Sequence, residues 1–273
     1  MATALAIQPD RPSTHRGGSG EPLVLIHGGG GTWRLWRTTI PLLEPHHDVL
    51  AVTLTGHFGG PELPAARVPS VEGLVDGVER DMDAAGMTTA HVVGASIGGW
   101  VALELARRGR ARSVVAIAPG GGWEQGSREV RRVAWIYRLL VGGSRVLGRL
   151  AARLGTRPRL RRLLVWHHFA HAERMTPDDF AYMVAGAAGM SRWSEAIAAF
   201  VRSPGAERLD EIDCPVLLAF PERDHVLPRR RYGERLIAQL PHARVVDLPG
   251  VGHAAMVDDP ELVARTILGF TLR

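Results

Sequence analysis

The sequence of 273 residues contains no lysine, only one cysteine, and no apolar run long enough to cross a bilayer. The single cysteine, Cys214, excludes an internal disulfide, which fits a reducing compartment, so we expect a cytoplasmic location. The first ten residues lack the basic start and the long apolar core of a secretory signal. With 45% hydrophobic residues, the chain has enough apolar side chains for one large domain carrying an insertion.

Because lysine is absent, arginine carries all of the basic charge behind the formal net charge of +5. Arginine is concentrated between Arg128 and Arg162. No nucleic-acid motif or interleaved aromatic pattern accompanies it, so we expect no nucleic-acid partner and favour a solvated face on amphipathic helices. The alternative is that this basic region contacts an anionic membrane surface or an acidic substrate tail. Nothing in the sequence indicates an oligomeric state.

The most informative stretch is residues 90–100, AHVVGASIGGW. It predicts a strand over His91 to Val93, a Gly-x-Ser-x-Gly turn centred on Ser96, and a helix from Gly99. Small residues are needed where a strand and a helix approach so closely. The hydroxyl of Ser96 would then lie at the positive end of a helix, where negative charge is stabilised.

Strands alternate with helical patterns on both sides of this turn, which predicts an α/β fold with a mostly parallel central sheet and helices on both faces. Between Trp123 and Pro204 only helical periodicity is present. We therefore expect an α/β core over residues 1–122 and 205–273 and a helical lid over residues 123–204. We expect helices over 36–43 and 159–169, among others.

Four glycines, residues 28–31, follow the apolar run that ends at His27. The backbone must bend sharply there and come close to another group. A developing oxyanion needs fixed backbone donors, so the predicted role of this loop is an oxyanion hole that uses the N–H of Gly29.

A serine at its ordinary pKa is a weak nucleophile, and it needs an imidazole base that is itself oriented by a carboxylate. The sequence places Asp224 after the strand ending at Phe220 and His253 after the last predicted strand. Loops that follow parallel strands gather at one edge of the sheet. Ser96, Asp224 and His253 are therefore predicted to meet there as a catalytic triad.

These residues resemble the α/β-hydrolase superfamily over nearly the whole chain, apart from the lid. The motifs are His27-Gly28-Gly29, the Gly-x-Ser-x-Gly turn around Ser96, Asp224 with its flanking residues, and Gly252-His253. The resemblance implies Ser96 as nucleophile, His253 as base, Asp224 as its partner, and the N–H groups of Gly29 and Ile97 as the oxyanion hole. The order of serine, aspartate and histidine along the chain is also the order expected for this superfamily.

Other residues compete for these roles. Glu222 and Asp213 lie near the position of the acid, but Asp224 has the family spacing. We expect His225 to point outward, His27 to hydrogen-bond nearby backbone, and His57 to be a solvated loop residue. Three histidines of the lid, at positions His167, His168 and His171, suggest a metal cluster at first sight. No carboxylate or cysteine stands at a suitable spacing, so no metal or other cofactor is expected.

The serine at the turn decides between branches of the superfamily. Epoxide hydrolases and haloalkane dehalogenases of this fold use an aspartate there, so Ser96 favours acyl transfer from an ester, thioester or lactone. Carbon–carbon bond hydrolases usually carry an aromatic residue after the catalytic histidine, where this chain has Ala254. These hydrolases, cofactor-free haloperoxidases or perhydrolases, and a non-catalytic accessory protein stay as alternatives.

The expected partner is a small to medium apolar ester, because aromatic residues are frequent in the lid. We predict five residues to contact it, namely Gly28, Gly30, Trp33, Trp123 and Val226.

Overall fold

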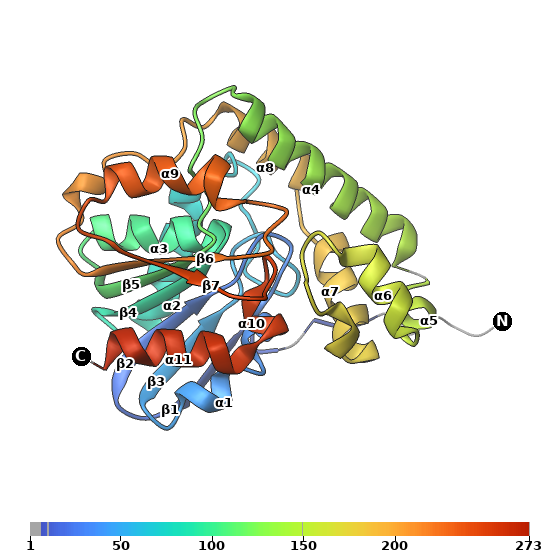
Figure 1. The fold of residues 1–273 in the computed structure, drawn as a ribbon, viewed down its shortest axis with the longest axis horizontal. Helices are drawn as coiled ribbons and strands as arrows, with labels where there is room; N and C mark the ends of the chain where they lie inside the picture. The colour runs from blue at the N-terminus through green and yellow to red at the C-terminus, as the bar shows by residue number, and fades with distance from the viewer. Residues whose placement is uncertain (1–6, 10, 149, 273) are drawn as a thin grey trace.

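The computed structural model describes residues 7–9, 11–148 and 150–272 (Figure 1). Its centre is a seven-stranded sheet in the order β1-β3-β2-β4-β5-β6-β7, with β1 antiparallel to β3 and every other pair parallel. This confirms the predicted mostly parallel sheet. The strands are β1 (Thr14–Gly18), β2 (Glu21–Ile26), β3 (His47–Val52), β4 (Ala90–Ala95), β5 (Ala111–Ile117), β6 (Val216–Pro221) and β7 (Arg244–Leu248).

Helices cover both faces of the sheet, because its strands are apolar on both sides. In β2, for example, Val24 and Ile26 belong to one core, whereas Leu23 and Leu25 belong to the other, and all four are fully buried. Figure 1 shows the two helical layers on opposite sides of the sheet. One layer contains α2 (Val71–Ala84), α3 (Ile97–Arg107) and α9 (Arg229–Gln239), and the other contains α1 (Ile40–Leu43) and α11 (Pro260–Thr271).

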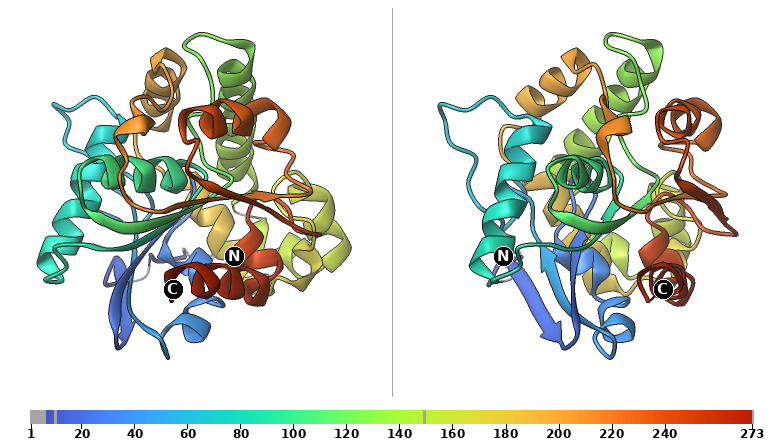
Figure 2. Two further views of the ribbon diagram at one scale, coloured as in Figure 1. Left: turned by 60° about the vertical axis from the view of Figure 1, so that its left-hand side comes forward. Right: turned by 90° about the vertical axis from the view of Figure 1, so that its left-hand side faces the viewer.

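Between β5 and β6 the described residues form helices and no strand, as the periodicity predicts. The longest helix, α4, packs against α7 and α8, and Figure 2 shows α4 in green beside α8 in orange. Hydroxyls cap two of these helices, since Ser127 accepts the N–H of Val130 and Thr176 accepts that of Asp179. The helices are α4 (Arg128–Leu147), α5 (Ala151–Gly155), α6 (Pro158–Val165), α7 (Pro177–Ala188) and α8 (Trp193–Arg202). We call residues 123–204 the insertion.

Two predicted helices have different limits in the structure. The expected helix over 36–43 is wrong: a 3-10 helix, Trp33–Trp36, is followed by a turn and then by α1, which starts anew around Pro41. Proline has no N–H to donate to the preceding turn, so it favours a fresh start. Helix α6 ends at Val165 instead of Phe169, and the next segment runs toward the short helix α10 (Ala255–Asp258). Among the described residues, no helix has the length and apolarity to cross a membrane.

Candidate active site

Ser96 lies at the junction of β4 and α3 with φ 55° and ψ −120°, a conformation that costs energy for a residue with a side chain. The surrounding glycines make the junction feasible. A Cβ at Gly94 would collide with the carbonyl of Gly98, and a Cβ at Gly98 would come within 2.5 Å of the carbonyl oxygens of Ile26 and His27. The sharp turn predicted from the motif is therefore present, and it places Ser96 at the N-terminus of α3.

The structure brings His253 and Asp224 together at the carboxyl edge of the sheet. His253 Nδ1 lies 2.8 Å from Asp224 Oδ2, and both side chains are buried. The other oxygen, Asp224 Oδ1, accepts the N–H groups of Val226 at 2.7 Å and Leu227 at 2.8 Å. A carboxylate only accepts hydrogen bonds, so His253 Nδ1 carries a proton, and Nε2 is the free, buried nitrogen without a partner among the described residues.

The two competing acids are accounted for by their positions. Glu222 accepts the N–H of Gly250 at 2.7 Å, so it stabilises the turn before His253 and does not contact the imidazole. Asp213 is exposed and precedes β6, which places it at the opposite end of that strand from Asp224.

The glycine loop after β2 is oriented by a buried histidine. The carbonyl of Gly28 accepts the N–H of Gly31 at 3.0 Å and faces His27 Nδ1 at 2.7 Å. His27 Nε2 in turn accepts the N–H of Leu54 at 3.0 Å, so the ring is neutral, and burial and the neighbouring His57 hold its pKa well below the usual value. In a trans peptide the N–H points opposite to the carbonyl, so these contacts direct the N–H of Gly29 away from His27. The predicted backbone-binding role of His27 is confirmed.

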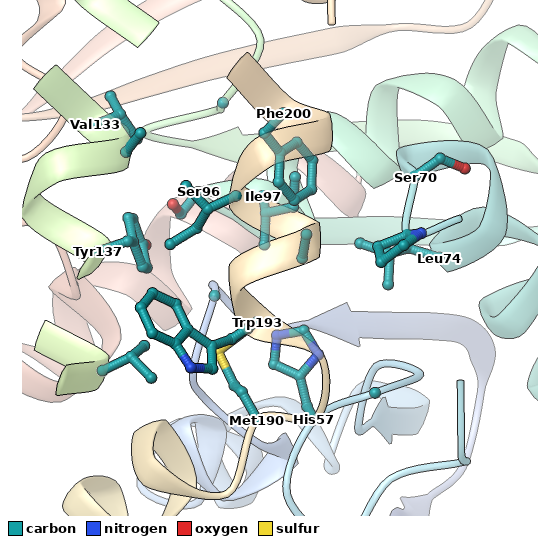
Figure 3. Close-up of a pocket in the computed structure, with 18 of the residues that line it drawn as sticks. His57, Ser70, Leu74, Ser96, Ile97, Val133, Tyr137, Met190, Trp193 and Phe200 are labelled. Atoms are coloured by element: carbon teal, nitrogen blue, oxygen red, sulfur yellow. The ribbon is translucent and has the colours of Figure 1, made fainter. Parts of the chain in front are cut away.

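Two apolar cavities meet at Ser96, and four residues line both of them, namely Gly29, Ser96, Tyr137 and Val141. The first, which we call the α8 cavity, extends between α2, α4 and α8 (Figure 3). The second, the α7 cavity, extends between the glycine loop, α7 and the His253 loop, and His253 lines only this one. Ser96 is 5% exposed, so solvent has little access to the junction of the cavities.

Tyr137 is a site residue that the sequence analysis treated only as part of an apolar helix face. Its ring lies against Gly29, where an added Cβ would be 3.1 Å from Tyr137 Cε1, and its hydroxyl faces Ser96 (Figure 3). Burial raises the pKa of the Tyr137 phenol, and a hydrogen bond with Ser96 opposes this. The phenol is therefore neutral and lies beside the predicted nucleophile. Helical spacing alone offers no signal that would single out Tyr137 from its neighbours.

The predicted substrate contacts divide into two groups. Gly28 and Gly30 line the α7 cavity, and Trp123 lines the α8 cavity. Trp33 and Val226 line neither cavity, so these two predictions are wrong. Trp33 stacks on His15 with the ring centres 5.3 Å apart, because the 3-10 helix turns its indole away from Ser96. The side chain of Val226 is fully buried in the core, and its neighbour Leu227 lines the α8 cavity instead.

The remaining histidines also have defined places. His225 is exposed, as expected. His57 is not a solvated residue but is 8% exposed and lines the α8 cavity, and burial lowers its pKa to about 4. His168 packs against His253 with the ring centres 5.4 Å apart. Within the described part of the chain, no group of three or more His, Cys, Asp or Glu side chains could hold a metal ion.

A parallel sheet with a strained serine between strand and helix, and a buried histidine–carboxylate pair at the same edge, define the class of α/β hydrolases. The model of the alpha/beta hydrolase family matches residues 23–266, so the chain belongs to this family.

Two curated relatives and one solved structure illustrate its range. The chain is 34% identical over 203 residues to the epoxide hydrolase EphH of Mycobacterium tuberculosis, which covers 72% of this chain and 92% of that protein. It is 30% identical over 263 residues to the putative carbamate hydrolase RutD of Azorhizobium caulinodans, covering 93% and 92%. The crystal structure of a membrane phospholipase A, described as a bacterial virulence factor, has the same fold, with a TM-score of 0.74 at 24% identity over 94% of this chain and 81% of that one.

Proposed function

We propose that the protein is a serine hydrolase that cleaves carboxylic esters, thioesters or lactones with apolar groups through an acyl-serine intermediate. The observation that carries the proposal is the buried Asp224–His253 pair, whose free Nε2 lines the same cavity as the strained Ser96. This arrangement supplies a nucleophile, a base and an orienting carboxylate from three separate loops.

In the proposed first step, Ser96 Oγ attacks the carbonyl carbon while His253 Nε2 accepts the hydroxyl proton. The negative charge moves to the carbonyl oxygen, which the N–H groups of Gly29 and Ile97 would bind. The N–H of Ile97 is available because the first N–H groups of a helix have no intrahelical acceptor. When the tetrahedral species collapses, His253 gives its proton to the departing oxygen or sulfur. Water then attacks the acyl-serine by the same route in reverse.

The two cavities suggest how a substrate is oriented. The departing group must lie near the proton on His253, which lines only the α7 cavity. The acyl group would then occupy the α8 cavity, whose walls are largely aliphatic and aromatic side chains. They include Leu74, Val133, Trp193, Ile197 and Phe200.

The relatives suggest two other substrate classes, which the residue at the turn separates. Attack of Ser96 on an epoxide would form an ether, which has no carbonyl for water to attack, so the enzyme would stop after one reaction. A carbamate keeps a carbonyl and can pass through the same steps as an ester. Carbamates therefore belong in the first substrate panel, whereas epoxides are expected to be poor substrates or inactivators.

The experiment is intact-protein mass spectrometry after treatment with a fluorophosphonate, comparing the wild type with His253→Ala. We expect one adduct that maps to Ser96 and forms much more slowly in the variant. Ser96→Ala should lower the turnover of any ester found in the panel by about a million-fold, because the triad acts as a unit. Absence of an adduct in the folded protein would favour the non-catalytic accessory role, and an adduct at another residue would move the nucleophile.

A further inference from the structure

Positive charge is concentrated in one part of the insertion. Residues 130–172 contain ten arginines and no aspartate or glutamate. Since the whole chain has 33 basic and 28 acidic residues, the remainder carries a formal charge of −5, whereas this segment carries +10. The molecule is therefore strongly polarised although its net charge is modest.

Arginines in the α/β core are mostly paired, whereas those of this segment are not. In the core, Arg108 contacts Glu79 at 2.8 Å and Arg229 contacts Asp247 at 3.0 Å. Among the described residues, five exposed arginines of the segment have neither a carboxylate within 4.0 Å nor a side-chain hydrogen bond. They are Arg138, Arg153, Arg157, Arg159 and Arg162. Their charge is available to an external anion.

Exposed apolar side chains gather in the same segment. Of nine exposed large hydrophobic side chains in the described chain, six lie between residues 135 and 166. Trp135, Leu139 and Val146 are 61%, 54% and 76% exposed and share one side of α4, because they are spaced by four and seven residues. The others are Leu150, Leu163 and Trp166.

Exposed apolar side chains of α4 meet the side chain of Trp166 in one groove. Trp135 and Leu139 line a groove together with Trp166, which directly follows α6. Figure 1 shows α4 and α6 side by side at the outer end of the insertion, away from the sheet. We call the six exposed apolar residues and the five unpaired arginines the insertion face.

We propose that the insertion face binds the surface of an anionic lipid bilayer. A bilayer of this kind offers both of the environments that the face requires, anionic headgroups for the arginines and an apolar interior edge for tryptophan, leucine and valine. A second copy of the chain would bring two strongly positive faces together, which like-charge repulsion opposes. Nucleic acid would pair with the arginines but has no partner for aliphatic side chains such as Leu139, Val146 and Leu163.

The test is flotation of the full chain with vesicles of phosphatidylglycerol and phosphatidylcholine, compared with vesicles of phosphatidylcholine alone. The charge variant replaces Arg138, Arg159 and Arg162 with glutamine. A basic residue near an anionic membrane surface strengthens binding about fivefold, so this variant should bind roughly 100-fold more weakly. Its matched control replaces three exposed arginines of the core with glutamine, at Arg230, Arg231 and Arg244.

The control variant has the same net charge as the charge variant but leaves the insertion face intact, so it should keep most of the binding. Trp135→Ala combined with Trp166→Ala should weaken binding without changing its dependence on salt. Equal binding to both kinds of vesicle, no binding, or equal losses in the two arginine variants would overturn the proposal. Stronger competition by a DNA oligonucleotide than by lipid would also overturn it and assign the face to a nucleic acid.

Membrane binding and hydrolysis are measured separately. None of the substituted residues lines a cavity with Ser96, so hydrolysis of a water-soluble ester should be unchanged in all variants and serves as the check on folding. Ser96→Ala should bind vesicles like the wild type. If no ester is hydrolysed, circular dichroism replaces this folding check, and failure of the proposed function leaves the vesicle result decisive on its own.

Discussion

The carboxylate of Asp258 connects the insertion with the loop of the predicted base. It is 2% exposed, and its Oδ2 accepts the N–H groups of Ala170 at 2.8 Å and Gly252 at 2.7 Å, while Oδ1 accepts that of His171 at 2.9 Å. Ala170 and His171 belong to the insertion, and Gly252 directly precedes His253. These bonds fix the segment that follows α6 against the loop of His253.

Asp258→Asn is expected to lower the free energy of unfolding by about 2 kcal/mol. The amide nitrogen cannot accept, so the best side-chain orientation keeps two of the three bonds and leaves the partly buried N–H of His171 unpaired. A hydrogen bond to a charged group contributes about 1.5–3 kcal/mol, which sets this magnitude. The loosened loop should also misplace His253 and lower kcat on the order of tenfold, more than it changes KM.

Asp259→Asn is the matched control because it removes the same charge from the adjacent residue. Asp259 caps α11 by accepting the N–H of Leu262, and asparagine is an equally good cap, so we expect a change within about 0.5 kcal/mol. Urea unfolding measures both variants, and hydrogen exchange follows residues 168–172 and 250–254. Equal stability of the two variants, or no faster exchange in these two segments of Asp258→Asn, would refute the reasoning.

Three further predictions concern Tyr137, His57 and the turn at Ser96. Tyr137→Phe should lower kcat about tenfold with little change in KM, because one hydroxyl beside Ser96 is lost; steady-state kinetics showing only a KM effect would contradict this. Burial lowers the pKa of His57 to about 4, so from pH 6.5 downward the unfolded chain binds a proton that the folded chain does not, and stability falls. Between pH 7 and pH 4, His57→Phe should remove about 3 kcal/mol of this loss in the free energy of unfolding, measured by urea titrations. An unchanged pH dependence would contradict the reasoning. Gly94→Ala should cost more than about 3 kcal/mol because its Cβ meets backbone. In contrast, Gly73→Ala on α2, whose Cβ would meet only Ser70 Oγ at 3.6 Å, should be neutral or stabilising in the same thermal melts.

The α/β fold and the main elements of the candidate site are predictable from the sequence for local reasons. An apolar strand, small residues around Ser96 and a following helix specify the strained turn, because only glycine fits where backbone meets backbone. Asp224 and His253 follow strands whose apolar runs predict a parallel sheet, and such a sheet brings those loops to one edge. The choice between Asp224 and Glu222 was only a matter of spacing, and the contact of Asp224 with His253 supports it.

Only the tertiary structure decides which segments far apart in the chain make contact. The sequence by itself determined the sheet, the turn at Ser96 and the residues that can act as base and acid. It did not determine that Tyr137 reaches Ser96, that Asp258 joins the insertion to the His253 loop, or that Trp33 faces away from the cavities. Periodicity indicates which side of a helix is apolar, but not what that side meets, because the packing of an insertion depends on side chains contributed by several distant elements at once.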